Sequence, residues 1–294
     1  MTDCTLSGNT SRDNVENIGG GGLFNYANCT ATLTNVTIDG NNSLYGGGLC
    51  NRGTLNMEGC TISDNLAYLF GGGIRNEGTL TMTDCTVADN ECFNESILAA
   101  YDGGGIYNHG TLNINGCNIT GNTCMANGSG IWNDTTLNIQ GNVQIKDNAD
   151  DDIYLPTGSK ITVTDTLTGG PGSIGVRMNS IGVFTQGYAA HNSETDHFFS
   201  DIIPNEIVME NGEAKMRYGY YECSWDSDSS QLVHTVKYIP DDVNIDNLCT
   251  SMFSNGGVLW GNDNWFVADG TGSTANGLTC SGSDIHIILC DGAE

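Results

Sequence analysis

The chain has 294 residues, with 41 Gly, 12 Cys and only 4 Pro, and its 9 basic and 35 acidic side chains give a formal net charge of −26. This charge argues strongly against nucleic-acid binding, which needs a basic face to displace counterions. A collagen triple helix is excluded, because Pro is scarce and the glycines do not recur at every third position. A hydrophobic share of 38% argues against disorder, and no apolar run approaches the ~20 residues of a transmembrane segment.

A repeat of about 25 residues dominates the first half of the chain. A Gly-rich block, an aliphatic residue and then Asn recur five times, and the closing residues are Asn25, Asn51, Asn76, Asn108 and Asn133. Each block is followed by an alternating run such as Gly53-Thr54-Leu55-Asn56-Met57, and then by Cys-Thr-aliphatic with an Asn three residues later. Alternation with period two indicates strands, and three short strands per repeat indicate one coil of a β-solenoid.

Stacked coils pair each strand in parallel with its counterpart about 4.8 Å away. One coil cannot bury its apolar face alone, whereas a stack shares one continuous core. Five clear coils and a degenerate sixth at Ile153–Val163 predict an all-β fold, a right-handed parallel β-helix of about six coils over residues 1–180. The Gly blocks suit tight turns with positive φ, which glycine adopts without steric strain.

The recurrent Asn residues predict ladders of hydrogen bonds along the solenoid axis. The expected members are the five block Asn and a second row at Asn65, Asn90 and Asn122. Asn tolerates left-handed backbone geometry at turns, and stacked Asn amides can bond to one another. A row of Asn that contacts glycans is the alternative. The structural ladder is favoured because Asn recurs at a turn of every coil.

These blocks resemble the polymorphic outer-membrane-protein type repeat and the wider right-handed parallel β-helix surface proteins of bacteria. That family pairs a Gly-Gly-Ala-Ile motif with a Phe-x-x-Asn motif. Here the first reads Gly-Gly-Gly-Leu/Ile or Gly-Ser-Gly-Ile, and an aliphatic residue replaces Phe in the second, as in Ile62 to Asn65. The resemblance covers residues 1–180 and implies a secreted or surface-displayed, adhesin-like protein. It supplies no catalytic residues.

The first residues repeat an internal segment, because Met1-Thr2-Asp3-Cys4-Thr5 is identical to Met82-Thr83-Asp84-Cys85-Thr86. Met1 therefore falls at a core position in the middle of a coil. The segment has no charged n-region, apolar h-region or cleavage site of a signal peptide. We expect a fragment of a longer exported protein, or one with an internal start, whose other modules are its covalent neighbours.

Four cysteines share one inward repeat position, which Val36 and Val143 fill in other coils: Cys4, Cys60, Cys85 and Cys117. Because Val can replace Cys there, the position suits a small hydrophobe, and we expect a buried stack of free thiols. No Cys-x-x-Cys pair supports a zinc site.

Cys92 and Cys124 are different, because each lies two residues past a turn Asn of adjacent coils. We expect them side by side in loops, as candidates for a disulfide in an oxidising compartment. The other cysteines outside the repeats, whose pairing cannot be read from the sequence, are Cys223, Cys249, Cys280 and Cys290.

The repeat fades after the acidic run Asp150-Asp151-Asp152. Clustered carboxylates are ligands for Ca²⁺, so this run is a weak calcium candidate; the favoured alternative is a solvated acidic turn in place of a Gly block. No other cofactor is expected. Residues 181–217 are predicted to form closing strands or a cap. Residues 218–294, which end in the apolar run Ile285–Cys290, are predicted to begin a second β-rich module, cut off at Glu294.

The favoured function is a non-catalytic segment of a large bacterial surface protein, either an adhesin for a glycan or protein partner or a structural spacer. A polysaccharide lyase or glycoside hydrolase is the alternative, disfavoured because only nine basic residues are present and such enzymes use Arg or Lys on acidic substrates. An ice-binding solenoid is disfavoured because the outward Thr residues alternate with Asn, Glu and Gln. An insertion at Glu91–Asp102, with Phe93, Ile97, Leu98 and Tyr101, is a candidate binding loop.

Overall fold

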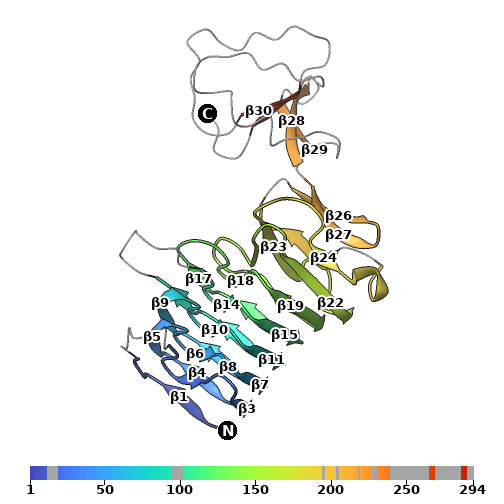
Figure 1. The fold of residues 1–294 in the computed structure, drawn as a ribbon. Coiled ribbons are helices and arrows are strands. Elements are labelled where there is room, and N and C mark those ends of the chain that lie inside the picture. Colours follow the sequence, from blue (N-terminus) through green and yellow to red (C-terminus); the bar gives the residue numbers. More distant parts are fainter. Residues whose placement is uncertain are drawn as a thin grey trace. The chain divides into compact units, whose positions relative to one another are not determined.

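The structure is a computed structural model that describes residues 1–11, 19–93, 102–193, 196–202 and 205–217, and the strands at 219–226, 231–238, 265–268 and 286–289. Over these residues the fold is all-β apart from one short 3-10 helix, and its main part is a parallel β-solenoid of about seven turns (Figure 1). The predicted solenoid is therefore confirmed, with one turn more than expected. Its alternating sequence produces strands because every second side chain can enter a shared core.

Each complete coil contributes four short strands rather than the three predicted. In one coil these are β6 (Leu49–Asn51), β7 (Thr54–Glu58), β8 (Thr61–Ser63) and β9 (Leu66–Phe70). The strand that sequence patterning missed is β9. Its counterparts in other coils share no motif, so repetition does not reveal them.

The counterparts of β7 form a seven-stranded sheet, in which all pairs are parallel. Its members are β3 (Thr30–Thr34), β7, β11 (Thr79–Thr83), β15 (Thr111–Asn115), β19 (Thr136–Gly141), β22 (Lys160–Leu167) and β24 (Thr185–Gln186). The counterparts of β9 form a four-stranded sheet: β5 (Asn42–Tyr45), β9, β13 (Glu91–Cys92) and β17 (Thr123–Cys124).

The counterparts of β8 and β6 form the two arms of a 14-stranded sheet, joined through β23 (Ile174–Met178). One arm contains β1 (Thr5–Ser7), β4 (Thr37–Asp39), β8, β12 (Thr86–Ala88), β16 (Asn118–Thr120) and β20 (Gln144–Ile145). The other contains β2 (Leu23–Asn25), β6, β10 (Ile74–Asn76), β14 (Ile106–Asn108), β18 (Ile131–Asn133) and β21 (Ile153–Leu155). β25 (Phe198–Ser200) pairs with β23.

The core is a set of aliphatic columns that run from coil to coil. In one column Leu55, Leu80, Leu112 and Leu137 stand in register on successive strands, and each is fully buried. Burial of each such side chain contributes roughly 1.5–3 kcal/mol. Because every column continues through the stack, each coil depends on its neighbours for a core.

The glycines of each block serve two different purposes. The first has a positive φ, for example +60° at Gly46 and +70° at Gly71. The second has a negative φ, but a Cβ on Gly47 would lie 2.3 Å from the carbonyl oxygen of Gly72 in the next coil. Glycine is needed there because the backbones of successive coils approach too closely for any side chain. The interpretation that the whole block needs positive φ is therefore right for its first glycine only.

Two ladders of Asn side chains link the coils, as predicted. In each ladder the Nδ2 of one Asn donates to the Oδ1 of the Asn in the next coil. The first ladder joins Asn25, Asn51, Asn76, Asn108 and Asn133 at 2.6 to 2.8 Å. The second joins Asn9, Asn41, Asn65, Asn90, Asn122 and Asn148 at 2.9 to 3.0 Å, which extends the predicted row at both ends.

The ladder residues satisfy backbone groups as well as one another. Asn65 donates a second hydrogen bond to the carbonyl of Ile38 at 2.9 Å, and its Oδ1 accepts the backbone N–H of Asn41 at 2.9 Å. The expected left-handed backbone lies one residue earlier in this ladder, at Asp64 (φ +54°) and Asp89 (φ +55°). These aspartates are therefore turn residues that place the following Asn in the core.

The four cysteines of the repeat position form a row at the corner before β1, β8, β12 and β16. Cys60, Cys85 and Cys117 are each 1% exposed, and the backbone N–H of Cys60 donates to the Sγ of Cys85 at 3.4 Å. The thiol thus accepts a corner N–H that Val could not satisfy, so it does more than fill space. Cys4 is exposed, against expectation, because its coil has a packed neighbour on one side only.

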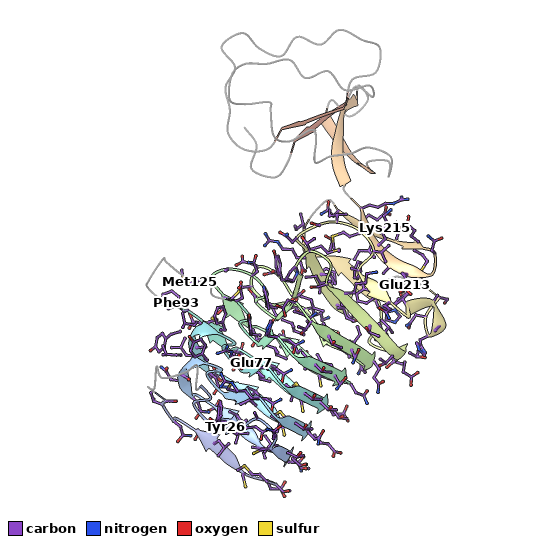
Figure 2. All side chains as sticks on the ribbon, viewed as in Figure 1. Tyr26, Glu77, Phe93, Met125, Glu213 and Lys215 are labelled. Atoms are coloured by element: carbon purple, nitrogen blue, oxygen red, sulfur yellow. The ribbon has the colours of Figure 1, made fainter. Side chains whose placement is uncertain are left out.

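Antiparallel pairing appears near the end of the solenoid unit. Val183 bridges Lys215 in antiparallel fashion, and Phe184 donates its backbone N–H to the carbonyl of Ala214 at 3.0 Å. Glu213 lies on β27 (Glu213–Arg217), which pairs with β26 (Glu206–Glu210). Its carboxylate accepts the N–H of Gly187 at 2.7 Å, where the 3-10 helix Tyr188–Ala190 begins. Figure 2 shows Glu213 and Lys215 on this closing segment.

The chain divides into two compact units, and the solenoid unit comprises Met1–Ile202 and Ile207–Met216. The other unit holds the antiparallel pair β28 (Gly219–Asp226) and β29 (Gln231–Tyr238) and the parallel pair β30 (Trp265–Ala268) and β31 (His286–Leu289). The strand expected near residue 285 is thus present as β31. The division at residues 180 and 217 stays a prediction, and Cys223, Cys249, Cys280 and Cys290 lie outside the side chains that the structure describes.

We expect Asn90→Ala to lower the free energy of unfolding by about 2–4 kcal/mol, because it removes the acceptor of two buried N–H groups of Asn65 and a hydrogen bond to the carbonyl of Ile62. Urea denaturation measures this change. The matched control is Asn118→Ala, which truncates an exposed Asn on β16 of the next coil. Equal stability of the two variants would contradict a structural role for the ladder.

Candidate functional site

The outward side of the seven-stranded sheet carries rows of hydroxyl and amide side chains. The same register that stacks Leu inside stacks Thr and Asn outside, since side chains alternate along a strand. One row contains Thr32, Asn56, Thr81, Asn113, Asn138 and Thr162, and the next contains Thr34, Glu58, Thr83, Asn115, Gln140 and Thr164. We call this surface the polar face.

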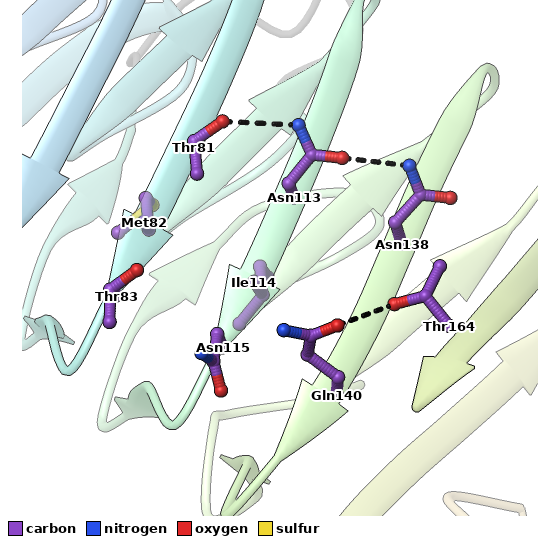
Figure 3. A pocket seen from close by; sticks show the side chains of 9 residues that line it. All are labelled: Thr81, Met82, Thr83, Asn113, Ile114, Asn115, Asn138, Gln140 and Thr164. Carbon is purple, nitrogen blue, oxygen red and sulfur yellow. Dashed lines mark hydrogen bonds between the residues drawn. The ribbon is translucent and has the colours of Figure 1, made fainter. Parts of the chain in front are cut away.

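The polar face is hollowed between β11 and β22, where the hollow encloses about 360 Å³ (Figure 3). Seven outward side chains line it: Thr81, Thr83, Asn113, Asn115, Asn138, Gln140 and Thr164. Met82 and Ile114 also belong to its lining, although their side chains are at most 2% exposed and lie in the core beneath the sheet. A shift in strand register between Ile139 and Gly141 borders the hollow, so β22 does not continue the flat row of β19.

Several lining side chains are held in place by one another. Asn113 donates from Nδ2 to the Thr81 hydroxyl at 3.2 Å and accepts at Oδ1 from the Nδ2 of Asn138 at 2.7 Å (Figure 3). The Thr164 hydroxyl donates to the Oε1 of Gln140 at 2.9 Å. These bonds fix the amides and leave other polar atoms, such as the Nε2 of Gln140, directed to solvent.

The lining of the hollow has no titratable side chain. It therefore offers hydrogen-bond donors and acceptors to a polar ligand, but it supplies no general acid or base that could activate a Thr hydroxyl. Sequence reasoning treated these outward residues only in weighing ice binding. The signal that could have identified them is the alternation of Thr, Asn and Gln at equivalent positions of successive repeats.

A second surface feature is an aromatic stripe along the arm of β2 to β21. The rings of Tyr107 and Trp132 stack at 4.5 Å with an interplanar angle of 4°, and Phe70 lies 4.8 Å from Tyr107. Because these rings stack along the solenoid axis, the face of one ring is covered by the next ring. A sugar binds an aromatic ring through its face, so this pair stabilises the stack rather than offering a binding platform.

The few cations of the repeats are engaged in contacts with neighbouring coils. Arg52 pairs with Glu77 at 2.6 Å, and Arg75 contacts the same carboxylate and lies over the Tyr45 ring at 4.4 Å. His109 lies 2.8 Å from Asp134. These contacts give the cations structural partners, and none of these residues lines the hollow.

A short apolar stripe crosses the four-stranded sheet. Tyr68, Phe93 and Met125 occupy equivalent positions on successive coils and are 37%, 38% and 52% exposed. Figure 2 shows Phe93 and Met125 close together. Phe93 belongs to the insertion Glu91–Asp102 predicted as a binding loop, whose Ile97, Leu98 and Tyr101 lie outside the described residues.

The acidic run Asp150–Asp152 replaces a Gly block, but it is not a solvated turn throughout. Asp151 is 1% exposed and accepts the N–H of Gly128 at 2.8 Å, and Asp152 is 4% exposed and accepts the Nδ2 of Asn148 at 2.8 Å. Asp152 thereby ends the second Asn ladder, because a carboxylate has no hydrogen to pass on. Only Asp150 is exposed. Among the residues that the structure describes, no three Asp, Glu, His or Cys side chains form a group that could hold a metal ion.

Asp201, which follows β25, joins this acidic cluster. Its Oδ2 accepts the backbone N–H of Asp152 at 2.9 Å, and the carboxylates of Asp152 and Asp201 both lie against the Cα of Gly175. Burial, and next the negative charge of Asp152, raise the pKa of Asp201 to about 8. Burial also raises the pKa values of Asp151 and Asp152. The positive charge of Arg177 opposes the rise in the pKa of Asp151.

This arrangement predicts that the solenoid gains stability on acidification. The pKa of Asp201 is higher in the folded chain than its ordinary value of 3.8, so protonation favours the folded state, and stability falls as pH rises from about 4 to about 8. We expect Asp201→Asn to flatten the dependence of melting temperature on pH over this range. Asp150→Asn removes one charge from the exposed member of the cluster, and an equal flattening in that variant would contradict the assignment.

Cys92 and Cys124 lie opposite each other on β13 and β17, as expected, but in buried strands rather than loops. Both thiols are free in the structure, and Cys92 donates to the carbonyl of Leu69 at 3.0 Å. Burial raises the pKa of Cys92, and it raises that of Cys124 to about 11, so neither thiol forms a reactive thiolate readily. The disulfide between them stays a prediction.

Neighbouring strands lie about 4.8 Å apart, within the Cα separation that a disulfide spans. We expect oxidative refolding in glutathione buffer to link Cys92 to Cys124 and to raise the free energy of unfolding by about 3 kcal/mol. Peptide mapping by mass spectrometry without reductant detects the link. Cys50→Ser should leave the link intact, whereas oxidised protein without the linked peptide would rule the pairing out.

The part of the chain that the structure describes contains no helix of the length and apolarity needed to cross a membrane. No protein-family model, curated protein or solved structure matches this chain.

Proposed function

We propose that this chain is a non-catalytic, adhesin-like segment of a large bacterial surface protein, which binds an extracellular ligand on the polar face. The observation that carries the proposal is the hollow between β11 and β22. It is lined by seven hydroxyl and amide side chains and by no acidic or basic side chain that could activate a nucleophile. Such a surface can recognise a ligand through hydrogen bonds without transforming it.

The rest of the solenoid also favours binding over catalysis. A lyase or hydrolase of this fold class needs charged groups in its cleft, and the charged pairs of the repeats serve other contacts, as at Arg52 and Glu77. Asp64 and Asp89, which stand on adjacent coils, hold left-handed turns. A net charge of −26 would also repel the polyuronates on which many parallel β-helix enzymes act.

Display at the cell surface is supported by the construction of the fold. Asn ladders and aliphatic columns hold successive coils in register. Such a stack can carry a binding surface on a proteolytically resistant rod. The resemblance to polymorphic outer-membrane-protein type repeats and the low content of Lys and Arg point the same way. A passive spacer is the second candidate, favoured by the same rigid ladders.

The experiment that separates these functions is a binding screen on arrays of glycans and extracellular-matrix proteins. An adhesin should bind at least one class of ligand, and the substitution Asn138→Ala in the hollow should weaken that binding about tenfold. Asn118→Ala, on another side of the coil, should not. Absence of any binding would favour the spacer, and release of reducing or unsaturated sugars from a polysaccharide panel would overturn the non-catalytic assignment.

A further inference from the structure

We infer that the ligand of the polar face is a neutral, hydroxyl-rich glycan, held in the hollow by Asn115, Asn138, Gln140 and Thr83. This inference rests on the proposed binding function and names the chemistry of its ligand. Four features of the hollow support it: its unused hydrogen-bonding groups, their fixed orientation, the absence of charge, and the absence of an apolar wall.

The hollow presents both donors and acceptors that no side chain uses. Asn138 donates to Asn113, which leaves its Oδ1 to accept, and Gln140 accepts from Thr164, which leaves its Nε2 to donate (Figure 3). The side chains of Asn115 and Thr83 make no hydrogen bond within the described part of the chain. A sugar hydroxyl both donates and accepts, so it matches a surface on which the two kinds of group alternate.

The orientation of these groups is set before a ligand arrives. Asn138 is tied through Asn113 to Thr81, and Gln140 is tied to Thr164, so the amides of Asn138 and Gln140 belong to hydrogen-bonded sets that together extend over four strands. The central lining positions are flanked in sequence by core residues on both sides, such as Leu137 and Ile139 beside Asn138. Such preorganisation reduces the entropy lost on binding.

Charge argues against an anionic ligand. No Lys or Arg lines the hollow, so a carboxylate or sulfate that entered it would lose water without gaining a cationic partner. The charged side chain on these rows is Glu58 on β7, and Lys160 stands on β22 opposite Thr136; neither belongs to the lining. The acidic excess of the whole chain adds long-range repulsion of an anionic glycan.

The hollow also lacks an exposed apolar wall. Met82 and Ile114 are buried beneath the polar groups, and no aromatic ring belongs to the lining. Lipids, apolar peptides and aromatic ligands would therefore bury little apolar surface there. A site of hydrogen bonds alone binds a single short glycan weakly, and dense display at a surface raises the effective affinity through multivalency.

The test uses the full chain, immobilised at high density, against two arms of probes. The neutral arm contains β-glucan, mannan and galactan oligosaccharides, and the anionic arm contains polygalacturonate and heparin. We expect binding in the neutral arm only, unchanged between low and high salt because no ion pair is involved. Asn138→Ala and Gln140→Ala should each weaken it about tenfold, the loss of roughly one or two hydrogen bonds, whereas Asn118→Ala should not.

A variant with altered charge tests whether the glycan binds in the hollow, because it should create a new binding preference as well as a loss of affinity. Asn138→Lys places a cation in the hollow and should weaken neutral binding while creating salt-sensitive binding to polygalacturonate. Circular dichroism shows whether each variant keeps the solenoid. Salt-sensitive binding of wild type to the anionic arm, binding to proteins alone, or neutral binding unaffected by all three hollow variants would each overturn the inference and leave an adhesin. No binding to any glycan or protein would refute the proposed function itself.

Discussion

The parallel stacking of one coil on the next, in fixed register, is the constraint on which the rest of this structure depends. Stacking brings backbones so close that Gly47 lies beneath the Gly72 carbonyl with no room for a Cβ. It also places equivalent Asn side chains within bonding distance, so that Asn65 and Asn90 connect at 2.9 Å. Each Asn bonds its neighbour and a backbone carbonyl, so a slip in register would leave buried amides unpaired. The ladders therefore specify the register strictly. The aliphatic columns specify it less strictly, because they tolerate exchange of one apolar residue for another.

The polar face is a consequence of the same register. Side chains alternate along a strand, so a column of Leu inside implies a column of Thr, Asn or Gln outside. Inward residues face one shared requirement, the exclusion of water, and they vary little. Outward residues are free of it, and their bonds to one another, such as Asn113 to Asn138, create a fixed polar lattice. The aromatic stripe shows the opposite outcome, because Tyr107 and Trp132 use their faces on each other and become part of the scaffold.

The repeat ends where charge replaces glycine. At Asp151 and Asp152 the chain still follows the path of a Gly block, and the carboxylates accept backbone and ladder N–H groups that the next coil would otherwise bind. Asp201 continues the series by accepting the N–H of Asp152. Burying these carboxyl groups together favours their protonated forms, so the end of the ladder responds to pH in a way that an amide ladder does not. Antiparallel pairing at Val183 and Lys215 then departs from the parallel pattern of the coils.

The sequence alone determined the solenoid, the inward columns and both Asn ladders, because each depends on a residue type that recurs at a fixed spacing. It did not reveal the strand β9 and its counterparts, whose residues share no motif. It also did not reveal that Asp151 and Asp152 are buried, because the local sequence of the acidic run is typical of a solvated turn. The sequence alone also did not reveal the candidate site. Repetition places Thr81, Asn113 and Asn138 in one row, but only the tertiary structure decides that the sheet is hollowed there and which amide atoms are already bonded. The repeat period of the sequence determines which residues are neighbours. The shape of a surface depends on strand curvature and on side-chain hydrogen bonds, which the repeat period does not determine.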